Sequence, residues 1–438
     1  MSPKPPQANS GRAAWYLVAV VVALTILSYV DRAVLSLFAH PVQEQLGLSD
    51  SAMGLLFGLG FIAPLALTTI VIGWAVDRFN RVMIIVLGVI VWSLASGLSG
   101  LAESFGGLML ARGLMGMGEA SIGPAGYAMV AASFAAERRG RAMGVIAAAA
   151  SVGTGVALIV GGMLLQALGE GQRSVPLIGA VEPWQAAYLL LGALGIPAAL
   201  LALTLRDRRP AAGENSPEHS GSGWAFLRVS PGLYAGVFAC AALNVAVGTG
   251  VIAWSPTLLV RKFDFAPADA GYVLGAMSIL GGLIGPPLAA ELSDRWLRSG
   301  RARGRMNGHA ALFGIMLSGV TILVTAPGPI VGAAGLLLVT MSLGALNALS
   351  YAAIPDLTPV AMTGRMLASL QFISLAAGYG SGPSLVAAFT DHIYQDKAML
   401  GAAMLSASLP LCLAGAAVAL LTGGRYAAAH HRISREAS

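Results

Sequence analysis

The stretch "GWAVDRFNR" at residues 73–81 is the most informative about the fold, because a similar stretch, "AELSDRWLR", stands at residues 290–298, offset by 217 residues. A second pair, "RRGRAMG" at 138–144 and "MTGRMLA" at 362–368, is offset by 224 residues. Two landmarks at nearly one offset indicate a chain built from two similar halves. Repeated halves around a central site are typical of membrane transporters.

Composition points to the same class of protein. Hydrophobic residues make up 56% of the 438 residues, charged residues only 11%, and the mean hydropathy is +0.76. A typical soluble protein has about 25% charged residues. These values exclude a soluble globular chain and predict one that crosses the membrane many times.

The apolar segments predict the number of crossings, since a membrane helix needs about 20 mostly apolar residues. We expect an all-α membrane protein with twelve transmembrane helices in two pseudo-symmetric six-helix bundles. The twelve segments lie at 14–39, 51–76, 82–101, 105–134, 142–168, 185–205, 231–260, 270–290, 310–327, 331–354, 366–390 and 398–422.

The domain boundaries follow from these segments and from a linker rich in Pro, Gly and Ser, a composition typical of flexible connections. The expected parts are an N-terminal cytoplasmic segment, a first bundle, a cytoplasmic linker, a second bundle and a cytoplasmic tail, at 1–13, 14–205, 206–229, 230–424 and 425–438.

Basic residues predict the orientation. Of the 26 Lys and Arg residues, twenty lie on one set of loops and the termini, four on the opposite set and two inside helices. This places both termini in the cytoplasm and accounts for the net charge of +6 without a nucleic-acid partner. The excess of Arg over Lys, with abundant Ala and Gly, suggests a bacterial chain and therefore the bacterial inner membrane.

The repeated charged loop predicts a cytoplasmic gate. We expect Gly73 to allow close packing, Asp77 to accept hydrogen bonds from a neighbouring helix N-terminus, and the arginines to pair with acids such as Glu137. The alternative is a charged loop that only sets orientation. The gate candidates are Gly73, Asp77, Arg78, Arg81, Glu137, Arg141, Asp294 and Arg295.

Four charges lie inside the predicted helices of the first half: Asp31, Arg32, Arg112 and Glu119. An ionised side chain at the bilayer centre costs about 2.5–3.5 kcal/mol on insertion scales, so such residues usually pair or line an ion or substrate path. A purely structural ion-pair network is the alternative.

Helix geometry narrows their roles. Arg112 and Glu119 are seven residues apart and share one face, about 10 Å apart along the helix. Asp31 and Arg32 point in directions about 100° apart. Asp31 and Arg112 lie at a similar depth in the membrane, so we expect them to attract each other. Arg32 is then expected to approach Glu119. We expect the two acids to carry protons, which serve as the coupling ion, and the arginines to bind an anionic group of the substrate. No metal or organic cofactor is expected.

The predicted helices of the second half contain no Asp, Glu, Lys or Arg and offer uncharged polar and aromatic groups instead. A cavity charged on one wall and largely apolar on the other suits an amphipathic substrate. Helix packing is the alternative for each aromatic residue. The substrate-binding candidates are Arg32, Arg112, Tyr127, Asn244, Trp254, Asn347, Tyr351 and Gln371.

These motifs resemble a known family. The twelve helices and "GWAVDRFNR" are similar to the major facilitator superfamily. "SYVDRAVLS" at 28–36 and "ARGLMGMGEASIGPAGYAMVAASF" at 111–134 resemble its Spinster members. The resemblance implies a proton-dependent transporter of lysolipid-like molecules, with the embedded charges matching the family's. Ala290 departs from the pattern where the first half has Gly73, which implies a weaker second gate.

The sequence therefore predicts a monomeric secondary active transporter in the lipid bilayer. It is expected to move a lysophospholipid- or sphingolipid-like substrate by alternating access, with proton coupling through the embedded acids. A transporter of organic or aromatic acids or drugs, and a membrane sensor that transports nothing, are the alternatives. An enzyme is not expected, because no His or Cys cluster lies within the membrane segments.

Overall fold

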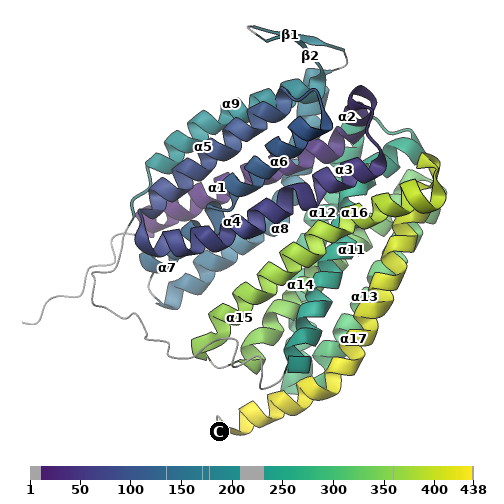
Figure 1. Ribbon diagram of the computed structural model, residues 1–438. Coiled ribbons are helices and arrows are strands. Elements are labelled where there is room, and N and C mark those ends of the chain that lie inside the picture. Colours follow the sequence, from purple (N-terminus) through teal and green to yellow (C-terminus); the bar gives the residue numbers. More distant parts are fainter. Residues whose placement is uncertain are drawn as a thin grey trace, which may run out of the picture. The chain divides into compact units, whose positions relative to one another are not determined.

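The computed structural model describes residues 11–134, 136–169, 171–176, 178–207, 231–358 and 360–436. Almost all of this part is helical, which agrees with the predicted all-α class (Figure 1). The chain divides into two compact units. Unit 1 comprises Met1–Pro41 and Gly60–Pro217, and unit 2 comprises Val42–Leu59 and Glu218–Ser438. Residues 42–59 thus belong with the second unit, whereas the sequence places them in the first bundle.

Unit 1 is a bundle in which α5 packs along α9 and α1 packs along α8 (Figure 1). Its helices are α1 (Gly11–Leu37), α4 (Leu59–Arg78), α5 (Arg81–Gly100), α6 (Phe105–Glu119), α7 (Ile122–Ser133), α8 (Ala136–Leu168) and α9 (Pro183–Leu203). An antiparallel hairpin of β1 (Arg173–Val175) and β2 (Gly179–Val181), with Arg173 opposite Val181, precedes α9.

Caps and small residues explain how these helices begin and approach each other. Asn80 caps α5 by accepting from the backbone N–H groups of Val82 and Met83, and Ser104 caps α6 in the same way. Gly118 lets α6 lie directly on α5, since a Cβ there would stand 2.5 Å from the backbone nitrogen of Trp92. Close approach through glycine is the usual means of joining membrane helices.

Unit 2 pairs α12 with α14 and α13 with α17. Its helices are α3 (Asp50–Phe57), α11 (Pro231–Phe263), α12 (Pro267–Arg298), α13 (Arg303–Thr325), α14 (Pro329–Leu357), α15 (Val360–Ile373), α16 (Gly380–Ala388) and α17 (Leu400–Glu436). Two π-helical turns, η1 (Ser374–Tyr379) and η2 (Phe389–Tyr394), flank α16, and the short 3₁₀ turn η3 (Lys397–Met399) precedes α17. The short helix α2 (Ala39–Leu46) crosses the boundary between the units.

Three predicted helices are interrupted. The helix expected over 51–76 is broken at Gly58 into α3 and α4. The helix expected over 105–134 is broken after Glu119 into α6 and α7. The helix expected over 366–390 contains η1. Hydropathy does not register such breaks, because the apolar run continues through each of them.

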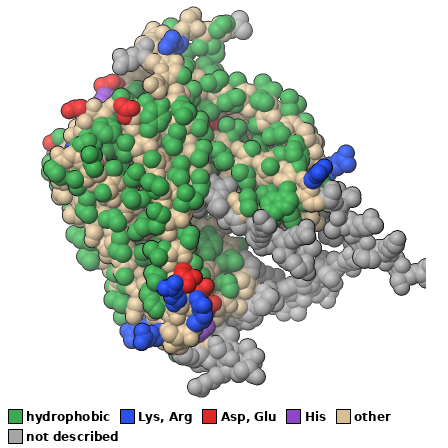
Figure 2. Space-filling model, turned by 180° about the vertical axis from the view of Figure 1, so that it is seen from behind, with side chains coloured by type: hydrophobic (Ala, Val, Ile, Leu, Met, Phe, Trp, Pro, Cys, Tyr) green, Lys and Arg blue, Asp and Glu red, His purple; other side chains and the backbone are tan. Residues whose placement is uncertain are grey.

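Among the described residues, ten helices are long and apolar enough to cross a membrane, with α3 and α4 together counted as one. The other two predicted crossings correspond to the broken pair α6 and α7 and to α8, of which Val152–Leu168 forms a shorter apolar helix. Hydrophobic side chains cover most of the face seen in Figure 2, and charged side chains gather in a few clusters there. The chain is a multi-pass membrane protein.

Candidate functional site

The four embedded charges lie together in unit 1, on α1 and α6. Arg32 Nε donates a hydrogen bond of 2.9 Å to Oε2 of Glu119, and the terminal nitrogen of Arg32 pairs with the same oxygen. The Glu119 side chain is 1% exposed and that of Arg32 17%, so the pair is largely withdrawn from solvent. The expected approach of Arg32 to Glu119 is therefore present in the structure.

Asp31 is held from another direction, by α5. The indole nitrogen of Trp92 donates to Oδ2 of Asp31, and Ser96 Oγ donates to Oδ1 over 2.7 Å. Both carboxylate oxygens therefore have a donor, as buried polar groups generally require. Trp92 and Ser96 are four residues apart and lie on one face of α5.

Arg112 lies within electrostatic range of Asp31 and Glu119, which agrees with the expected attraction between Asp31 and Arg112. Phe61 on α4 contacts both arginines. Its ring centroid lies 4.6 Å from the guanidinium carbon of Arg32 and 5.3 Å from that of Arg112. These are cation–π distances. Phe61 therefore lies against both positive groups of the cluster.

The cluster combines charge balance with unused hydrogen-bonding capacity. Two acids and two arginines sum to zero when all are ionised. Within the described part of the chain, Oε1 of Glu119 and the buried hydroxyl of Tyr188 on α9 have no hydrogen-bond partner. A buried polar atom in this condition is costly, so it is suited to receive a proton, a water molecule or a polar ligand group.

Unit 2 joins two of its candidate residues. Asn244 on α11 donates from Nδ2 to Oδ1 of Asn347 on α14 over 3.1 Å, and also to the Leu343 carbonyl over 3.2 Å. Oδ1 of Asn244 is buried and has no hydrogen-bond partner among the described residues. This pair therefore keeps one buried acceptor available for a polar ligand group.

The other uncharged candidates differ in position. Trp254 is fully buried, and its indole nitrogen donates to the Pro383 carbonyl over 3.0 Å. Its ring packs edge-on against Phe57. These contacts agree with helix packing, the alternative role considered for each aromatic residue. Tyr351 on α14 and Gln371 on α15 are exposed, whereas Tyr127 on α7 is half-buried. In this structure Trp254 is therefore a packing residue of unit 2 whose indole nitrogen already has an acceptor.

The segments predicted for the second half contain no charged residue, but α13 and α14 extend beyond those segments and carry charged side chains near their ends. Arg305 on α13 is 2% exposed and donates to Ser293 Oγ over 2.7 Å and to Tyr426 Oη over 3.0 Å. It also forms an ion pair with Asp356 on α14. A buried arginine thus joins four helices of unit 2 at one end.

The gate residues of the first half make other contacts than expected. Arg81 lies 3.9 Å from Oδ1 of Asp207, and its backbone N–H donates to the same carboxylate over 3.0 Å. Arg78 stacks on Trp74 at 4.3 Å. Glu137, the expected partner, and Arg141 have side chains outside the part of the chain that the structure describes.

A Cβ at Gly73 would meet no atom of the described residues within 4 Å, so Gly73 makes no close packing contact with that part of the chain. Asp77 is exposed. In the second half, Asp294 Oδ1 lies 3.8 Å from Arg305, and Arg295 donates to Glu291 over 2.8 Å. The two loops therefore share a sequence pattern but differ in their contacts.

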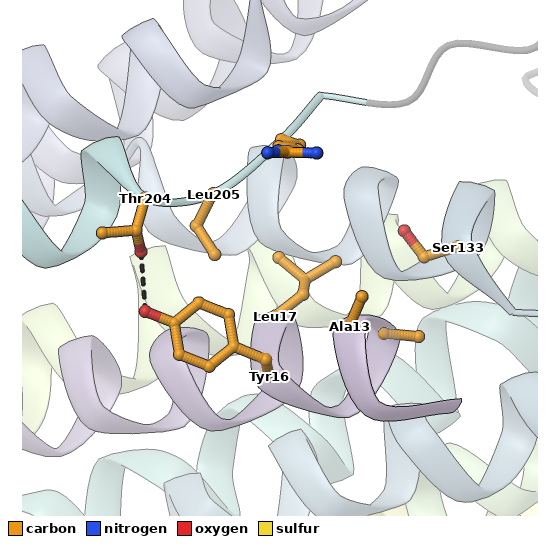
Figure 3. A pocket seen from close by; sticks show the side chains of 8 residues that line it. Ala13, Tyr16, Leu17, Ser133, Thr204 and Leu205 are labelled. Atoms are coloured by element: carbon orange, nitrogen blue, oxygen red, sulfur yellow. Dashed lines mark hydrogen bonds between the residues drawn. The ribbon is translucent and has the colours of Figure 1, made fainter. Parts of the chain in front are cut away.

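A small pocket lies away from the charge cluster, at the ends of α1, α7 and α9 (Figure 3). It encloses about 210 Å³, and Tyr16 and Thr204 share a hydrogen bond of 2.7 Å at its side. Since these hydroxyls satisfy each other, Ser133 and Arg206 are the main polar groups left in its lining. Ala13, Ala14, Leu17 and Leu205 complete it.

Sequence reasoning missed several residues of the site. A Trp and a Ser four residues apart on an apolar helix could have indicated a polar site, since both present hydrogen-bond donors on one face of the helix. Phe61 and Tyr188 carry no such signal, because an aromatic residue in an apolar run is usually a packing residue. Their position beside the charges depends on how α4 and α9 pack against α1 and α6.

The Major Facilitator Superfamily model matches residues 21–383. Among characterised proteins, the chain is 31% identical over 296 residues to an MFS-type efflux pump of Mycolicibacterium smegmatis, covering 65% of each protein. It is 29% identical over 311 residues to protein spinster homolog 1 of Homo sapiens, covering 66% of this chain and 56% of that protein. These matches span less than two thirds of either relative.

Among solved structures, a bacterial homologue of the human lysosomal transporter Spinster in an inward-facing, unoccupied conformation matches with a TM-score of 0.78 at 22% identity. The match covers 97% of this chain and 98% of that one. The occupied form of an inward-facing homologue matches with a TM-score of 0.74 at 23% identity. This likeness supports the predicted twelve-helix fold.

Proposed function

We propose that this chain, which belongs to the Major Facilitator Superfamily, is a Spinster-type secondary active transporter of an amphipathic, lysophospholipid- or sphingolipid-like substrate. Transport proceeds by alternating access and is coupled to protons. The protein lies in a bacterial inner membrane with both termini in the cytoplasm, since the basic residues favour that orientation.

The observation that carries this proposal is the buried ion pair between Arg32 and Glu119, with Asp31 and Arg112 beside it. Buried acids and arginines at membrane depth usually mark ion or substrate paths. Because Oε1 of Glu119 has no hydrogen-bond partner among the described residues, Glu119 can take up a proton without first losing a contact at that oxygen.

The arginines supply the binding site for the anionic head of the substrate. A guanidinium binds phosphate or carboxylate through paired hydrogen bonds. Protonation of Glu119 releases Arg32 from its ion pair, so that the guanidinium becomes available to the substrate. Proton binding and head-group binding then affect each other through one pair of side chains, which is a direct means of coupling.

Purified protein in liposomes that hold a pH-sensitive dye tests this mechanism. Addition of a lysophospholipid should produce a proton flux, which should disappear in Glu119→Gln and weaken in Asp31→Asn. Glu103→Gln is the matched control, because Glu103 is exposed in the loop before α6. Normal lysolipid-dependent flux in both test variants would end the proton-carrier proposal.

A second candidate is export of drugs or organic acids, which is favoured by the similarity to the efflux pump at 31% identity. Such a substrate would use the same arginines but would not need an apolar wall for an acyl chain. Thermal stabilisation of the purified protein by lysophospholipids, sphingoid phosphates and aromatic acids in parallel separates the two candidates.

A further inference from the structure

The pocket at the ends of α1, α7 and α9 has no part in the proposed mechanism, and all its lining residues belong to unit 1 (Figure 3). We propose that it binds the head group of an anionic diacyl phospholipid of the surrounding membrane, which joins three helix ends of unit 1. Leu17 in the pocket and Asp31 in the charge cluster are 14 residues apart on α1, roughly 21 Å along the helix. The proposal is therefore independent of the transported substrate and of proton coupling.

The pocket lies where membrane helices end, which is the depth of lipid head groups. Its α1 residues stand in the first two turns of that helix, Ser133 is the last residue of α7, and Thr204 directly follows α9. Tyr16 is 44% exposed, and Trp15 packs edge-on against Phe134 at 5.4 Å. Trp and Tyr are enriched at the interface between membrane and water.

Hydrogen bonds inside the pocket leave two polar side chains of its lining to bind a ligand. Thr204 Oγ1 donates to the Leu201 carbonyl over 2.6 Å, so it accepts in its 2.7 Å bond with Tyr16, drawn in Figure 3. Both hydroxyl protons are thus used within the protein. The hydroxyl of Ser133 and the guanidinium of Arg206 complete the polar lining, and both are donors that suit a phosphate oxygen.

The charges around the pocket favour an anion. Among the described residues that line it, none is acidic. Asp207 follows Arg206, but its carboxylate accepts from the backbone N–H of Arg81 over 3.0 Å and lies 3.9 Å from the Arg81 side chain. Arg12, exposed at the start of α1, adds a second cation next to the lining residue Ala13. A head group without an ammonium therefore matches the site, since an ammonium would find no acid in this lining.

The helix ends at the pocket are of both signs. The first turns of α1 bring the positive end of a helix dipole, whereas α7 and α9 bring negative ends. At the end of α9 the chain satisfies two of these carbonyls itself: the N–H of Thr204 donates to Leu201 over 3.2 Å, and that of Leu205 to Ala202 over 3.1 Å. This limits the negative charge that an anion meets there.

The size of the pocket points to a head group rather than a whole lipid. Its volume of about 210 Å³ lies below the roughly 300–1,000 Å³ of pockets that enclose a small molecule. The acyl chains must therefore lie outside. Exposed apolar side chains share one face of α9 and lead to the pocket: Ile196, Leu200 and Leu203. A lipid uses both this stripe and the polar lining, whereas free phosphate uses the lining alone.

Native mass spectrometry of the full-length protein in a neutral detergent measures lipid retention. Wild type should retain phosphatidylglycerol in preference to phosphatidylethanolamine with the same acyl chains. Arg206→Gln should weaken phosphatidylglycerol binding roughly fivefold, which is what one arginine near a membrane surface contributes to attraction of anionic lipid. Arg301→Gln removes an exposed arginine of another loop and should keep wild-type retention.

A second variant tests the cavity without changing its charge. The ring of Ala13→Phe takes up space in the pocket, so phosphatidylglycerol retention should fall at least as far as in Arg206→Gln. Ala132→Phe is the matched control, because Ala132 is exposed on α7 and lies outside the lining. Thermal unfolding in lipid-free detergent shows which variants fold, and Arg206→Gln decides alone if Ala13→Phe does not.

Backbone amide exchange locates the lipid on the protein. Added phosphatidylglycerol should slow exchange over residues 11–17 and 200–206, which form the pocket. Exchange over residues 105–119, which carry Arg112 and Glu119, should stay unchanged. A lipid bound at the charge cluster instead would slow exchange over 105–119 and would overturn the proposal.

Equal retention of phosphatidylglycerol in wild type, Arg206→Gln and a folded Ala13→Phe would also overturn it. Equal losses in Arg206→Gln and Arg301→Gln would do the same, by showing a general attraction of anionic lipid to basic loops. Protection of 11–17 and 200–206 by inorganic phosphate as strong as that by phosphatidylglycerol would assign the pocket to free phosphate and refute the lipid. None of these outcomes bears on the proposed function, because no measurement here involves transport.

Discussion

Arg32 on α1 donates from Nε to Oε2 of Glu119, the last residue of α6, over 2.9 Å, and this bond links two helices whose sequences are far apart. Glu119 is followed at once by the break between α6 and α7. The pair therefore holds the C-terminal end of α6 against α1, at the point where the chain leaves the helix. It contributes both a balanced charge and a contact between helices to unit 1.

Arg32→Gln should destabilise the protein by about 3–5 kcal/mol, because it leaves the carboxylate of Glu119 buried without its cation. Addition of Glu119→Gln to that variant should recover much of the loss, since no buried charge then remains. Thermal unfolding of the purified variants measures both effects. Additive losses in the double variant would contradict the pairing.

Ser96→Ala should weaken the hold of α5 on Asp31. The hydroxyl donates to Oδ1 over 2.7 Å, and loss of a donor to a buried carboxylate costs about 1.5–3 kcal/mol. Ser99→Ala is the matched control, since that buried hydroxyl donates over 3.1 Å to the Ala95 carbonyl of its own helix. Thermal unfolding should therefore separate the two variants, and equal losses would argue against a special role of Ser96.

Gly118→Ala should disturb the packing of α6 on α5. The added methyl would stand 2.5 Å from the backbone nitrogen of Trp92 and 2.6 Å from the Gly88 carbonyl oxygen, and such overpacking costs about 1–3 kcal/mol. Because Trp92 donates to Asp31, proton flux should fall together with stability. Gly97→Ala, where a Cβ would meet no atom of the structure within 4 Å, should be neutral or slightly stabilising.

Arg305→Gln should destabilise unit 2 strongly. Arg305 is buried, pairs with Asp356 and bonds to Tyr426, so its loss leaves several polar groups without a partner and should cost about 3–5 kcal/mol. Arg301→Gln, an exposed position four residues earlier, should have little effect in the same unfolding experiment. Similar melting of the two variants would show that the network contributes little.

Phe61→Leu should loosen both arginines of the charge cluster, because the ring lies 4.6 Å from Arg32 and 5.3 Å from Arg112. Loss of a cation–π contact costs about 0.5–2 kcal/mol. Apparent affinity for an anionic lysolipid, measured from the concentration dependence of flux, should fall in Phe61→Leu and be largely kept in Phe61→Tyr. Equal affinity in all three proteins would assign Phe61 to packing alone.

Much of the fold could be predicted because it depends on properties that the sequence carries directly. Apolar runs of sufficient length define membrane helices, whatever packs around them. The repeated loops at 73–81 and 290–298 show two halves. The cluster could be predicted in part for a similar reason, since ionised groups inside apolar helices must find one another or water.

Other features could not be predicted, because they depend on how separate helices meet. Hydropathy does not detect the break at Gly58. The assignment of residues 42–59 to unit 2 and the pairing of Asp50 with Arg261 could therefore not be predicted. Likewise, Arg305 and Asp356 lie at helix ends that the predicted apolar segments leave out.

The sequence by itself determined the class of protein, the two halves and the four embedded charges, because the cost of placing polar groups in lipid acts on each segment alone. Tertiary structure alone decided the partners: Arg32 with Glu119, Asp31 with Trp92 and Ser96. Hydrogen bonds and ion pairs act over about 3 Å, so they are set by helix packing, which no single segment specifies.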